Sequence, residues 1–251
     1  MTLPATPSFR LDGRRAFVPG GTRGIGLGCA VALAEAGAEV VVCARSEAGV
    51  TEAVEAMRAA GHGADGRACD VSDLAMLDAF LAEYGPFDIL CNSAGVARHG
   101  PSAETTPEDF DLVAGLNLRA AYFMAQKIAA TMNNGGSIIQ ISSQMGHVGG
   151  VDRAVYCATK HGVEGMTKAM AIEWGPKNIR VNTICPTFIR TPLTEATFNN
   201  PERRAWIDEK IKLPRVGEVE DIMGPVVFLA SEASAMITGT SILVDGGWTA
   251  G

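Results

Sequence analysis

The sequence predicts an α/β fold, in which helices cover both faces of a parallel sheet. Short runs of apolar and β-branched residues alternate along the chain with longer helical stretches. Most of the short runs are continuously apolar, which is typical of strands that are buried on both faces. The expected strands are residues 15–18, 39–44, 67–71, 87–92, 137–142, 180–185 and 241–244.

Helices are expected between these strands, at residues 25–36, 48–60, 106–132 and 156–174. The first of them stops before Gly37, and the last stops before Gly175-Pro176. The third begins at Thr106-Pro107-Glu108-Asp109, which offers a capping hydroxyl, a proline at the first position and acids in the first turn. Repeated strand–helix units predict a doubly wound, three-layer (Rossmann) fold with a seven-stranded parallel sheet.

The composition indicates a single domain that spans residues 1–251. Of these residues 47% are hydrophobic and 20% are charged, so the chain can bury one sizeable core. The formal net charge is −7 with no lysine or arginine run, which argues against a nucleic-acid partner. No apolar stretch reaches the about 18 residues of a membrane span. Because segment 1–15 also lacks a signal-peptide core, we expect a soluble, cytoplasmic protein.

The cysteines form no CxxC pair and no Cys/His cluster with zinc spacing. We therefore expect reduced, buried thiols and no metal site. The six positions are Cys29, Cys43, Cys69, Cys91, Cys157 and Cys185.

One segment, residues 191–214, interrupts the alternation of strands and helices. It has no strand signal and carries both aromatic and charged side chains, among them Glu195, Phe198, Arg203, Arg204 and Trp206. Long segments of this kind often close over binding sites, so we expect a substrate lid. A helical surface excursion without a binding role is the alternative.

A glycine-rich loop, Gly20-Gly21-Thr22-Arg23-Gly24-Ile25-Gly26, joins the first expected strand to the first helix. Glycines let the backbone approach phosphates closely, and the following helix offers free N–H groups to a pyrophosphate. The spacing is GxxxGxG, and a glycine turn by itself often serves only chain geometry. The strand before the loop and the helix after it therefore carry the prediction of a dinucleotide site.

The end of the second expected strand bears on the choice of coenzyme. In dinucleotide folds an acid here binds the adenosine ribose, whereas an arginine nearby accommodates a 2′-phosphate. The chain has Ala44-Arg45-Ser46 and no acid, while Arg23 adds a second positive charge from the glycine loop. Two guanidinium groups favour NADP over NAD. NAD is the alternative, because both arginines could be solvated surface residues.

A candidate catalytic group surrounds Tyr156 and Lys160, which are four positions apart and so share one face of a helix. An ammonium close to a tyrosine lowers the pKa of the phenol toward neutrality. This spacing is common by chance and gains weight from its surroundings. Ser143 follows a buried strand, where parallel sheets bind ligands. Asn117 stands inside a helix, where asparagine needs a structural reason.

Together these motifs resemble the classical short-chain dehydrogenase/reductase family over nearly the whole chain. The resemblance implies an oxidoreductase that transfers a hydride between NADP(H), or NAD(H), and a secondary alcohol or ketone. The family's catalytic tetrad matches Asn117, Ser143, Tyr156 and Lys160. It implies that Tyr156 exchanges the proton, Ser143 binds the carbonyl oxygen, and Lys160 lowers the Tyr156 pKa and holds the nicotinamide ribose. Asn117 is expected to hold a water that links Lys160 to solvent.

The family's coenzyme contacts map onto the glycine loop and onto the ends of later strands. The residues implied are Gly20, Thr22, Arg23, Gly24, Ile25, Gly26, Arg45, Asp70, Val71, Asn92, Ala94, Gly95, Tyr156, Lys160, Pro186, Thr187, Ile189 and Thr191. Three positions depart from the family pattern. Pro19 precedes the first glycine in place of threonine, so we expect one bracing hydrogen bond to be missing. Ser93 replaces the second asparagine of Asn-Asn-Ala-Gly, and Thr187 replaces a glycine beside the nicotinamide pocket.

The substrate pocket is expected between residues 144–155 and 191–214. Its candidate contacts are Ser143, Gln144, Met145, His147, Tyr156 and Phe188, although His147 could equally belong to a surface loop. The mixed lining favours a small polar ketone, polyol or sugar acid, and the C-terminal half resembles the sugar-alcohol and gluconate dehydrogenase branch.

Two other functions are alternatives. A 3-oxoacyl-carrier-protein reductase would have to dock an acidic carrier, for which a chain of net charge −7 is poorly suited. A non-catalytic NADP-binding sensor tends to lose the tyrosine or the lysine, and this chain keeps both. The family usually forms tetramers, so a homotetramer is expected, with the apolar tip at Trp248 as a candidate interface residue.

Overall fold

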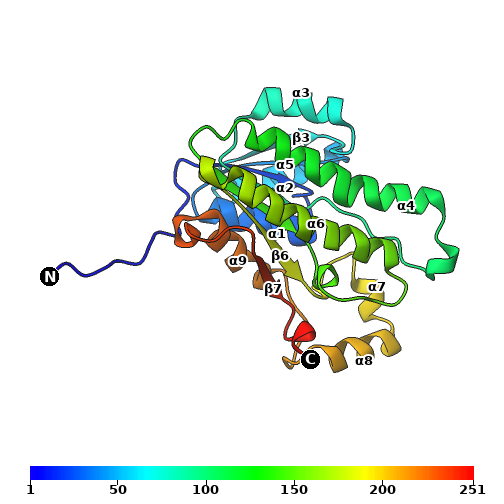
Figure 1. Ribbon diagram of the computed structural model, residues 1–251. Coiled ribbons are helices and arrows are strands. Elements are labelled where there is room, and N and C mark those ends of the chain that lie inside the picture. The colour runs from blue at the N-terminus through cyan, green and yellow to red at the C-terminus, as the bar shows by residue number, and fades with distance from the viewer.

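The computed structural model describes residues 1–251 and has a sheet of seven parallel strands at its centre (Figure 1). The strand order is β3-β2-β1-β4-β5-β6-β7, so the chain winds outward in both directions from β1 and β4, as predicted. The strands are β1 (Arg15–Pro19), β2 (Glu39–Ala44), β3 (Ala64–Ala68), β4 (Ile89–Asn92), β5 (Gly136–Ile141), β6 (Ile179–Pro186) and β7 (Ser241–Val244).

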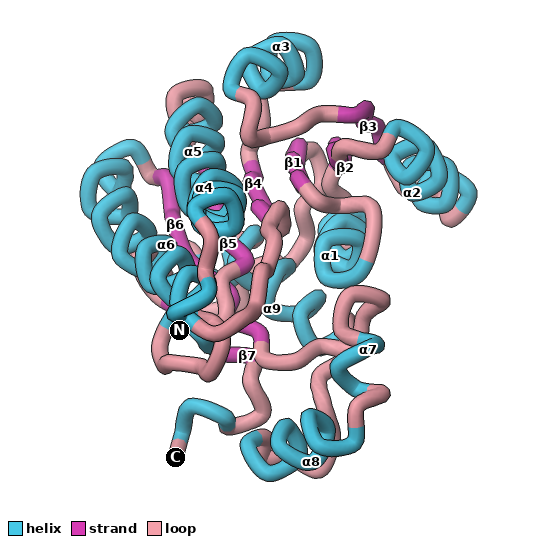
Figure 2. Tube along the Cα trace, turned by 90° about the vertical axis from the view of Figure 1, so that its right-hand side faces the viewer, coloured by secondary structure: helices cyan, strands magenta, loops and turns pink.

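Helices cover both faces of the sheet (Figure 2). On one face lie α1 (Gly24–Glu35), α2 (Glu47–Ala59) and α9 (Glu220–Ala230). On the other lie α3 (Leu74–Tyr84), α4 (Pro107–Ala114), α5 (Ala121–Ala129) and α6 (Ala154–Trp174). Two short helices of segment 191–214, α7 (Glu195–Phe198) and α8 (Pro201–Lys210), stand apart from these layers. None of the helices combines the length and apolarity that crossing a bilayer requires.

Each face of the sheet has its own apolar core. On the α3 side, Phe17 stacks on Phe80 and Phe87 with ring centroids 5.0 and 5.2 Å apart. Burial of large aromatic side chains on this scale contributes strongly to stability. All six cysteines are free and buried, as expected.

The predicted start of the long helix is confirmed, and its middle has an unexpected form. The hydroxyl of Thr106 accepts a hydrogen bond from the Asp109 N–H at 3.2 Å, and Pro107 begins α4. Between α4 and α5 the helix widens into a π-helical segment, Gly115–Ala120, which contains Asn117. Such segments are rare and occur frequently at functional sites.

The expected third strand was placed wrongly by about three residues. It runs over Ala64–Ala68, because these residues pair with Val40–Ala44 of β2 at the edge of the sheet. The apolar residues that suggested a later strand, Cys69 and Val71, follow the strand and pack into the core as a loop. Helices α3 and α9 escape the sequence prediction; in α9, Gly224 and Pro225 obscure the helical pattern.

Candidate active site

The residues predicted to bind coenzyme and substrate gather at the carboxyl edge of the sheet. Gly20 follows β1, Arg45 follows β2, and Asp70 lies two residues beyond β3. Ala94 comes after β4, and Thr187 comes after β6. In a parallel sheet all of these ends lie along one edge, where doubly wound folds bind ligands.

The glycine loop between β1 and α1 leaves no room for side chains. A Cβ on Gly26 would collide with the carbonyl oxygen of Gly20, and a Cβ on Gly20 would lie 2.9 Å from the carbonyl oxygen of Ser93. Gly20 and Gly24 also have positive φ angles of 77° and 52°, which favour glycine. The first turn of α1 has no side-chain cap at Arg23, so its N–H groups are available to a ligand. This cradle fits a pyrophosphate.

The adenosine end of the site has unpaired positive charge. Neither Arg23 nor Arg45 has a carboxylate within 4.0 Å. The Ser72 hydroxyl and N–H donate to Asp70 at 2.6 and 3.0 Å. The Ser72 hydroxyl is the main cause that lowers the pKa of Asp70, and the charge of Arg45 adds to it. Asp70 therefore stays ionised beside the strand ends.

The end of β6, where the nicotinamide is predicted to bind, carries a buried polar group without a hydrogen-bond partner in the protein. The hydroxyl oxygen of Thr187 is buried and has no hydrogen-bond partner, which fits a coenzyme group at this position. Thr191 approaches Gly24, so the start of segment 191–214 lies against the glycine loop. Pro19 is the last residue of β1, and its carbonyl accepts a hydrogen bond from the Ser93 N–H at 3.1 Å.

Asn117 braces the loop that follows β4. Its side-chain oxygen accepts from the Val96 N–H, and its amide nitrogen donates to the Val96 carbonyl, both at 2.8 Å. This pair of bonds explains an asparagine inside a helix, because the side chain ties the π-helical segment to the coenzyme edge. The role of holding a water near Lys160 stays a prediction.

Ser143, Tyr156 and Lys160 come together where β5 ends and α6 begins. The Lys160 ammonium donates to the Ile141 carbonyl at 2.9 Å and lies 5.6 Å from the centroid of the Tyr156 ring. The Ser143 hydroxyl donates to the side-chain oxygen of Gln144 at 3.0 Å. Ser143, Gln144 and Lys160 are buried, and Tyr156 is half-buried.

Burial dominates the protonation of the central pair. It raises the pKa of Tyr156, and the Ser143 hydroxyl and the charge of Arg153 oppose this shift. Burial lowers the pKa of Lys160 to about 8, and Cys185 and Glu164 oppose this shift. Lys160 was expected to lower the pKa of Tyr156. In the structure, the cation Arg153, three residues before the tyrosine, lowers this pKa. No sequence motif points to Arg153.

A polar cluster behind Lys160 was also missed. The Nε2 atom of His147 lies 3.3 Å from Cys185 Sγ and 3.7 Å from a carboxylate oxygen of Glu164. The Thr183 and Ser241 hydroxyls donate to that carboxylate at 2.9 and 2.5 Å. The members come from a loop, a helix and two strands, so no linear spacing links them. His147, one of the predicted substrate contacts, therefore contacts this polar cluster through its ring.

An aromatic cluster forms the wall on the lid side. Phe188 packs against Trp206 and Trp248 with centroids 5.9 and 5.6 Å apart, and the two tryptophans are 4.9 Å apart. Met145 is buried in the same cluster. Trp248 is 7% exposed, so its expected place at a subunit interface is wrong: it is already buried by helix α8 of its own chain.

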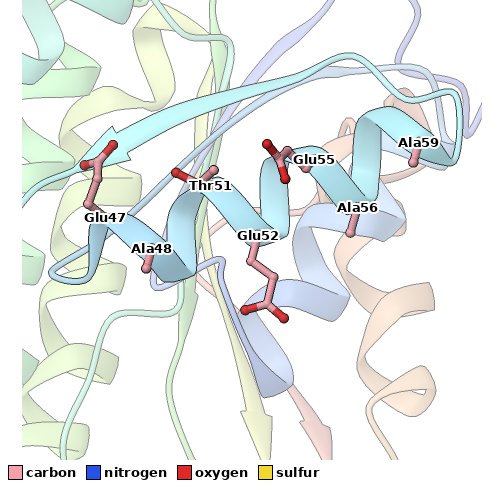
Figure 3. A pocket seen from close by; sticks show the side chains of 7 residues that line it. All are labelled: Glu47, Ala48, Thr51, Glu52, Glu55, Ala56 and Ala59. Atoms are coloured by element: carbon pink, nitrogen blue, oxygen red, sulfur yellow. The ribbon is translucent and has the colours of Figure 1, made fainter.

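A shallow depression runs along the outer side of α2 (Figure 3). Its lining includes Glu47, Glu52 and Glu55, and it contains none of the catalytic or coenzyme candidates. An acidic surface repels phosphate, so we assign it no part in the site.

Comparison with known proteins agrees with this geometry. The family model described as Enoyl-(Acyl carrier protein) reductase matches residues 20–249. The chain is 40% identical to D-threitol dehydrogenase of Mycolicibacterium smegmatis, over 96% of this chain and 95% of the relative. It is 39% identical to 2-dehydro-3-deoxy-D-gluconate 5-dehydrogenase of Escherichia coli, over 97% and 98% of the two chains.

A solved structure adds a coenzyme-bound neighbour. The gluconate 5-dehydrogenase of Burkholderia cenocepacia, in complex with NADP and tartrate, superposes with a TM-score of 0.92 at 36% identity, covering 97% of this chain and 98% of that one. The predicted family, fold and reaction class are confirmed. The chain belongs to the short-chain dehydrogenase/reductase family and is an NAD(P)-dependent oxidoreductase that acts on CH–OH groups.

Proposed function

We propose that this enzyme interconverts the secondary alcohol and ketone of a small polyol or sugar acid, with NADP(H) as its coenzyme. The single observation that carries the proposal is the group of buried Ser143 and Lys160 with half-buried Tyr156, beside a glycine cradle at the same sheet edge. The relatives act, by their names, on threitol and on a deoxygluconate, which supports both substrate types. The names of these relatives favour this function over that of a 3-oxoacyl-carrier-protein reductase.

The chain's own residues divide the reaction between them. NADP(H), when bound, donates or accepts the hydride at the reacting carbon. In reduction Tyr156 gives its proton to the carbonyl oxygen, and in oxidation its phenolate removes the proton of the alcohol. The Ser143 hydroxyl donates a hydrogen bond to that oxygen as negative charge develops on it. Lys160, whose pKa is about 8, is mostly protonated near neutrality and supplies a positive charge beside the tyrosine.

The surrounding segments complete the proposal. Residues 1–251 act as one catalytic domain, and residues 191–214 close over the substrate, since Trp206 and Arg203 of α8 lie on the pocket side. The protein works in the cytoplasm as a homotetramer. Exposed apolar side chains on α4, α5, α6 and β7 support an assembly through these elements: Phe110, Leu112, Tyr122, Ile172 and Leu243.

The proposal is tested by a coenzyme-coupled turnover screen. We expect reduction of NADP+ with sugar acids or polyols and none with neutral long-chain alcohols, because the site is lined by polar groups around the tetrad. Turnover of a 3-oxoacyl thioester alone would reverse the substrate assignment. Binding of NADP+ without turnover of any substrate would indicate a sensor.

The coenzyme preference has its own test. The unpaired Arg45 is expected to bind the 2′-phosphate, so Arg45→Met should lower the ratio of kcat/KM for NADPH over NADH by roughly 10- to 100-fold. Arg67, which is ion-paired with Glu83 at 2.8 Å on the neighbouring strand, provides the control Arg67→Met. A wild-type enzyme that prefers NADH would contradict the NADP assignment.

A further inference from the structure

Arg153 is a half-buried cation without a carboxylate partner. Its side chain is half-buried at the start of α6, and no carboxylate lies within 4.0 Å of it. Its one hydrogen bond to the protein joins Nη1 to the Val151 carbonyl at 2.9 Å. Removing a charge from water is costly unless an opposite charge compensates it, and here the protein provides no carboxylate. Most of the donors of the guanidinium are therefore left for a ligand.

The guanidinium lies beside two aromatic rings. Its central carbon lies 5.7 Å from the centroid of the Phe188 ring and 5.9 Å from that of Trp206. One ring follows β6, and the other belongs to α8 in segment 191–214. Cation–π contacts of this kind favour a planar guanidinium and leave its N–H edge free. The arrangement is a preorganised donor fork between the catalytic helix and the proposed lid.

Arg153 lies in the same surroundings as Tyr156, the residue expected to exchange the proton. The positive charge of Arg153 lowers the pKa of Tyr156, against the effect of burial. His99 packs edge-on against Tyr156 with centroids 5.8 Å apart, and burial lowers its pKa to about 4, so it is neutral near pH 7. Arg203 of α8 adds a second unpaired positive charge, which lowers the pKa values of both Arg153 and His99.

Negative charge near this group is sparse. Asp152 precedes Arg153, but its effect on the Arg153 pKa is smaller than those of burial and of Arg203. Burial raises the pKa of Tyr156, so the phenol adds no negative charge near pH 7. The neighbouring arginines differ in this respect, because Arg98 and Arg204 are paired with Asp109 and Asp208. In a chain of net charge −7, an unpaired Arg153 close to the reacting tyrosine, with the unpaired Arg203 acting on it, marks a place for an anion.

We propose that Arg153, assisted by Arg203, binds the carboxylate of the substrate next to Tyr156, so that the enzyme's preferred substrate is a sugar acid and not the neutral polyol. This inference rests on the proposed function and narrows it. A guanidinium pairs with a carboxylate through two parallel hydrogen bonds, whereas a hydroxyl offers neither the charge nor the matching fork. Closing the lid over the substrate would bring the Arg203 charge to the same carboxylate.

The test compares D-gluconate with D-glucitol, which share a carbon skeleton and differ in the carboxylate. In Arg153→Met the ratio of kcat/KM for the acid over the polyol should fall by roughly 10- to 100-fold, since a hydrogen-bonded charge pair is lost. Arg153→Lys should keep part of the ratio, because it retains the charge and loses the fork. Arg203→Met should give a smaller fall. Arg204→Met is the matched control on the same helix and should keep the wild-type ratio.

Binding gives a readout that does not depend on turnover. Malonate carries carboxylates and no CH–OH group, so we expect it to bind the NADP+-loaded wild type in calorimetry and to bind Arg153→Met at least about tenfold more weakly. Thermal unfolding of each variant checks that the fold is retained. Failure of malonate to bind the wild type, or an unchanged substrate ratio in Arg153→Met, would overturn the inference.

The two proposals fail in different ways. Turnover of D-glucitol without turnover of D-gluconate overturns the carboxylate site and leaves the proposed function standing. Absence of turnover with every polyol and sugar acid overturns the proposed function, and malonate titration then decides the carboxylate site alone.

Discussion

The coenzyme half and the substrate half of the sheet edge are built in different ways. The coenzyme half is made mainly of backbone: glycines that admit no Cβ, the uncapped first turn of α1, and the ends of β1 to β4. The substrate half is made of side chains that meet from distant segments, such as Phe188, Trp206 and Trp248. A backbone site leaves a local signature in the sequence, whereas a side-chain site depends on tertiary packing.

The two halves also treat charge differently. Arg45 and Asp70 on the coenzyme side lie near the surface, where solvent screens them. Lys160 and Tyr156 on the substrate side are buried enough that desolvation is the main cause of their pKa shifts. Substitutions on the substrate side should therefore change chemistry and pH dependence, while those on the coenzyme side should change binding.

The largest expected effect separates chemistry from coenzyme binding. Tyr156→Phe removes the proton donor and leaves the ring in place, so kcat should fall by about 10²- to 10⁴-fold, the usual range for a general acid or base. NADP+ affinity, measured by titration calorimetry, should change by less than about threefold. Near-normal turnover in this variant would show that another group exchanges the proton.

The second-largest effect is expected from a substitution that disrupts the coenzyme half. Gly26→Val places a side chain against the Gly20 carbonyl oxygen, so the loop must shift and NADP+ binding should weaken by at least about 100-fold. The matched control is Gly165→Ala in α6, where an added Cβ meets nothing within 4 Å. Circular dichroism would verify the fold. Unchanged NADP+ affinity in Gly26→Val would place the pyrophosphate elsewhere.

The sequence predicts the coenzyme half well, because a site made of backbone leaves local motifs. The glycine loop, Asp70 and Asn92 are local motifs at strand ends, and the parallel sheet follows from continuously apolar strands. The shift of β3 arises because Cys69 and Val71 are as buried as strand residues without belonging to the strand. Helix α3 did have a local signal, since the Asp73 carboxylate caps its first turn at 2.9 and 3.1 Å.

The substrate half could be predicted only in part. Ser143, Tyr156 and Lys160 follow from spacing and strand ends. Arg153 is unremarkable in sequence, because the absence of a carboxylate within ion-pair distance and the contacts with Phe188 and Trp206 are tertiary facts. The same holds for the contact of His147 with Cys185, which are 38 positions apart.

The smallest expected effect concerns the support of Lys160 on the substrate side. Glu164 lies one helical turn after Lys160, is buried, and raises the lysine pKa against the effect of burial. Gln at this position can still accept from Thr183 and Ser241 but carries no charge, so Glu164→Gln should lower the Lys160 pKa below about 8. If catalysis needs the ammonium, activity persists below this pKa and is lost as the pH rises through it. The alkaline limb of the kcat/KM profile should therefore move to lower pH.

The size and the control of this effect follow from the same reasoning. We expect a loss of a few-fold at about pH 8 and none at about pH 6, where Lys160 stays protonated in both proteins. Glu173→Gln, at an exposed position of the same helix, should leave the profile unchanged. An alkaline limb that does not move in Glu164→Gln would mean that the charge of Glu164 does not reach Lys160 once coenzyme is bound. The contrast between the halves would then rest mainly on burial, because desolvation, opposed only by Cys185, would set the protonation of the lysine.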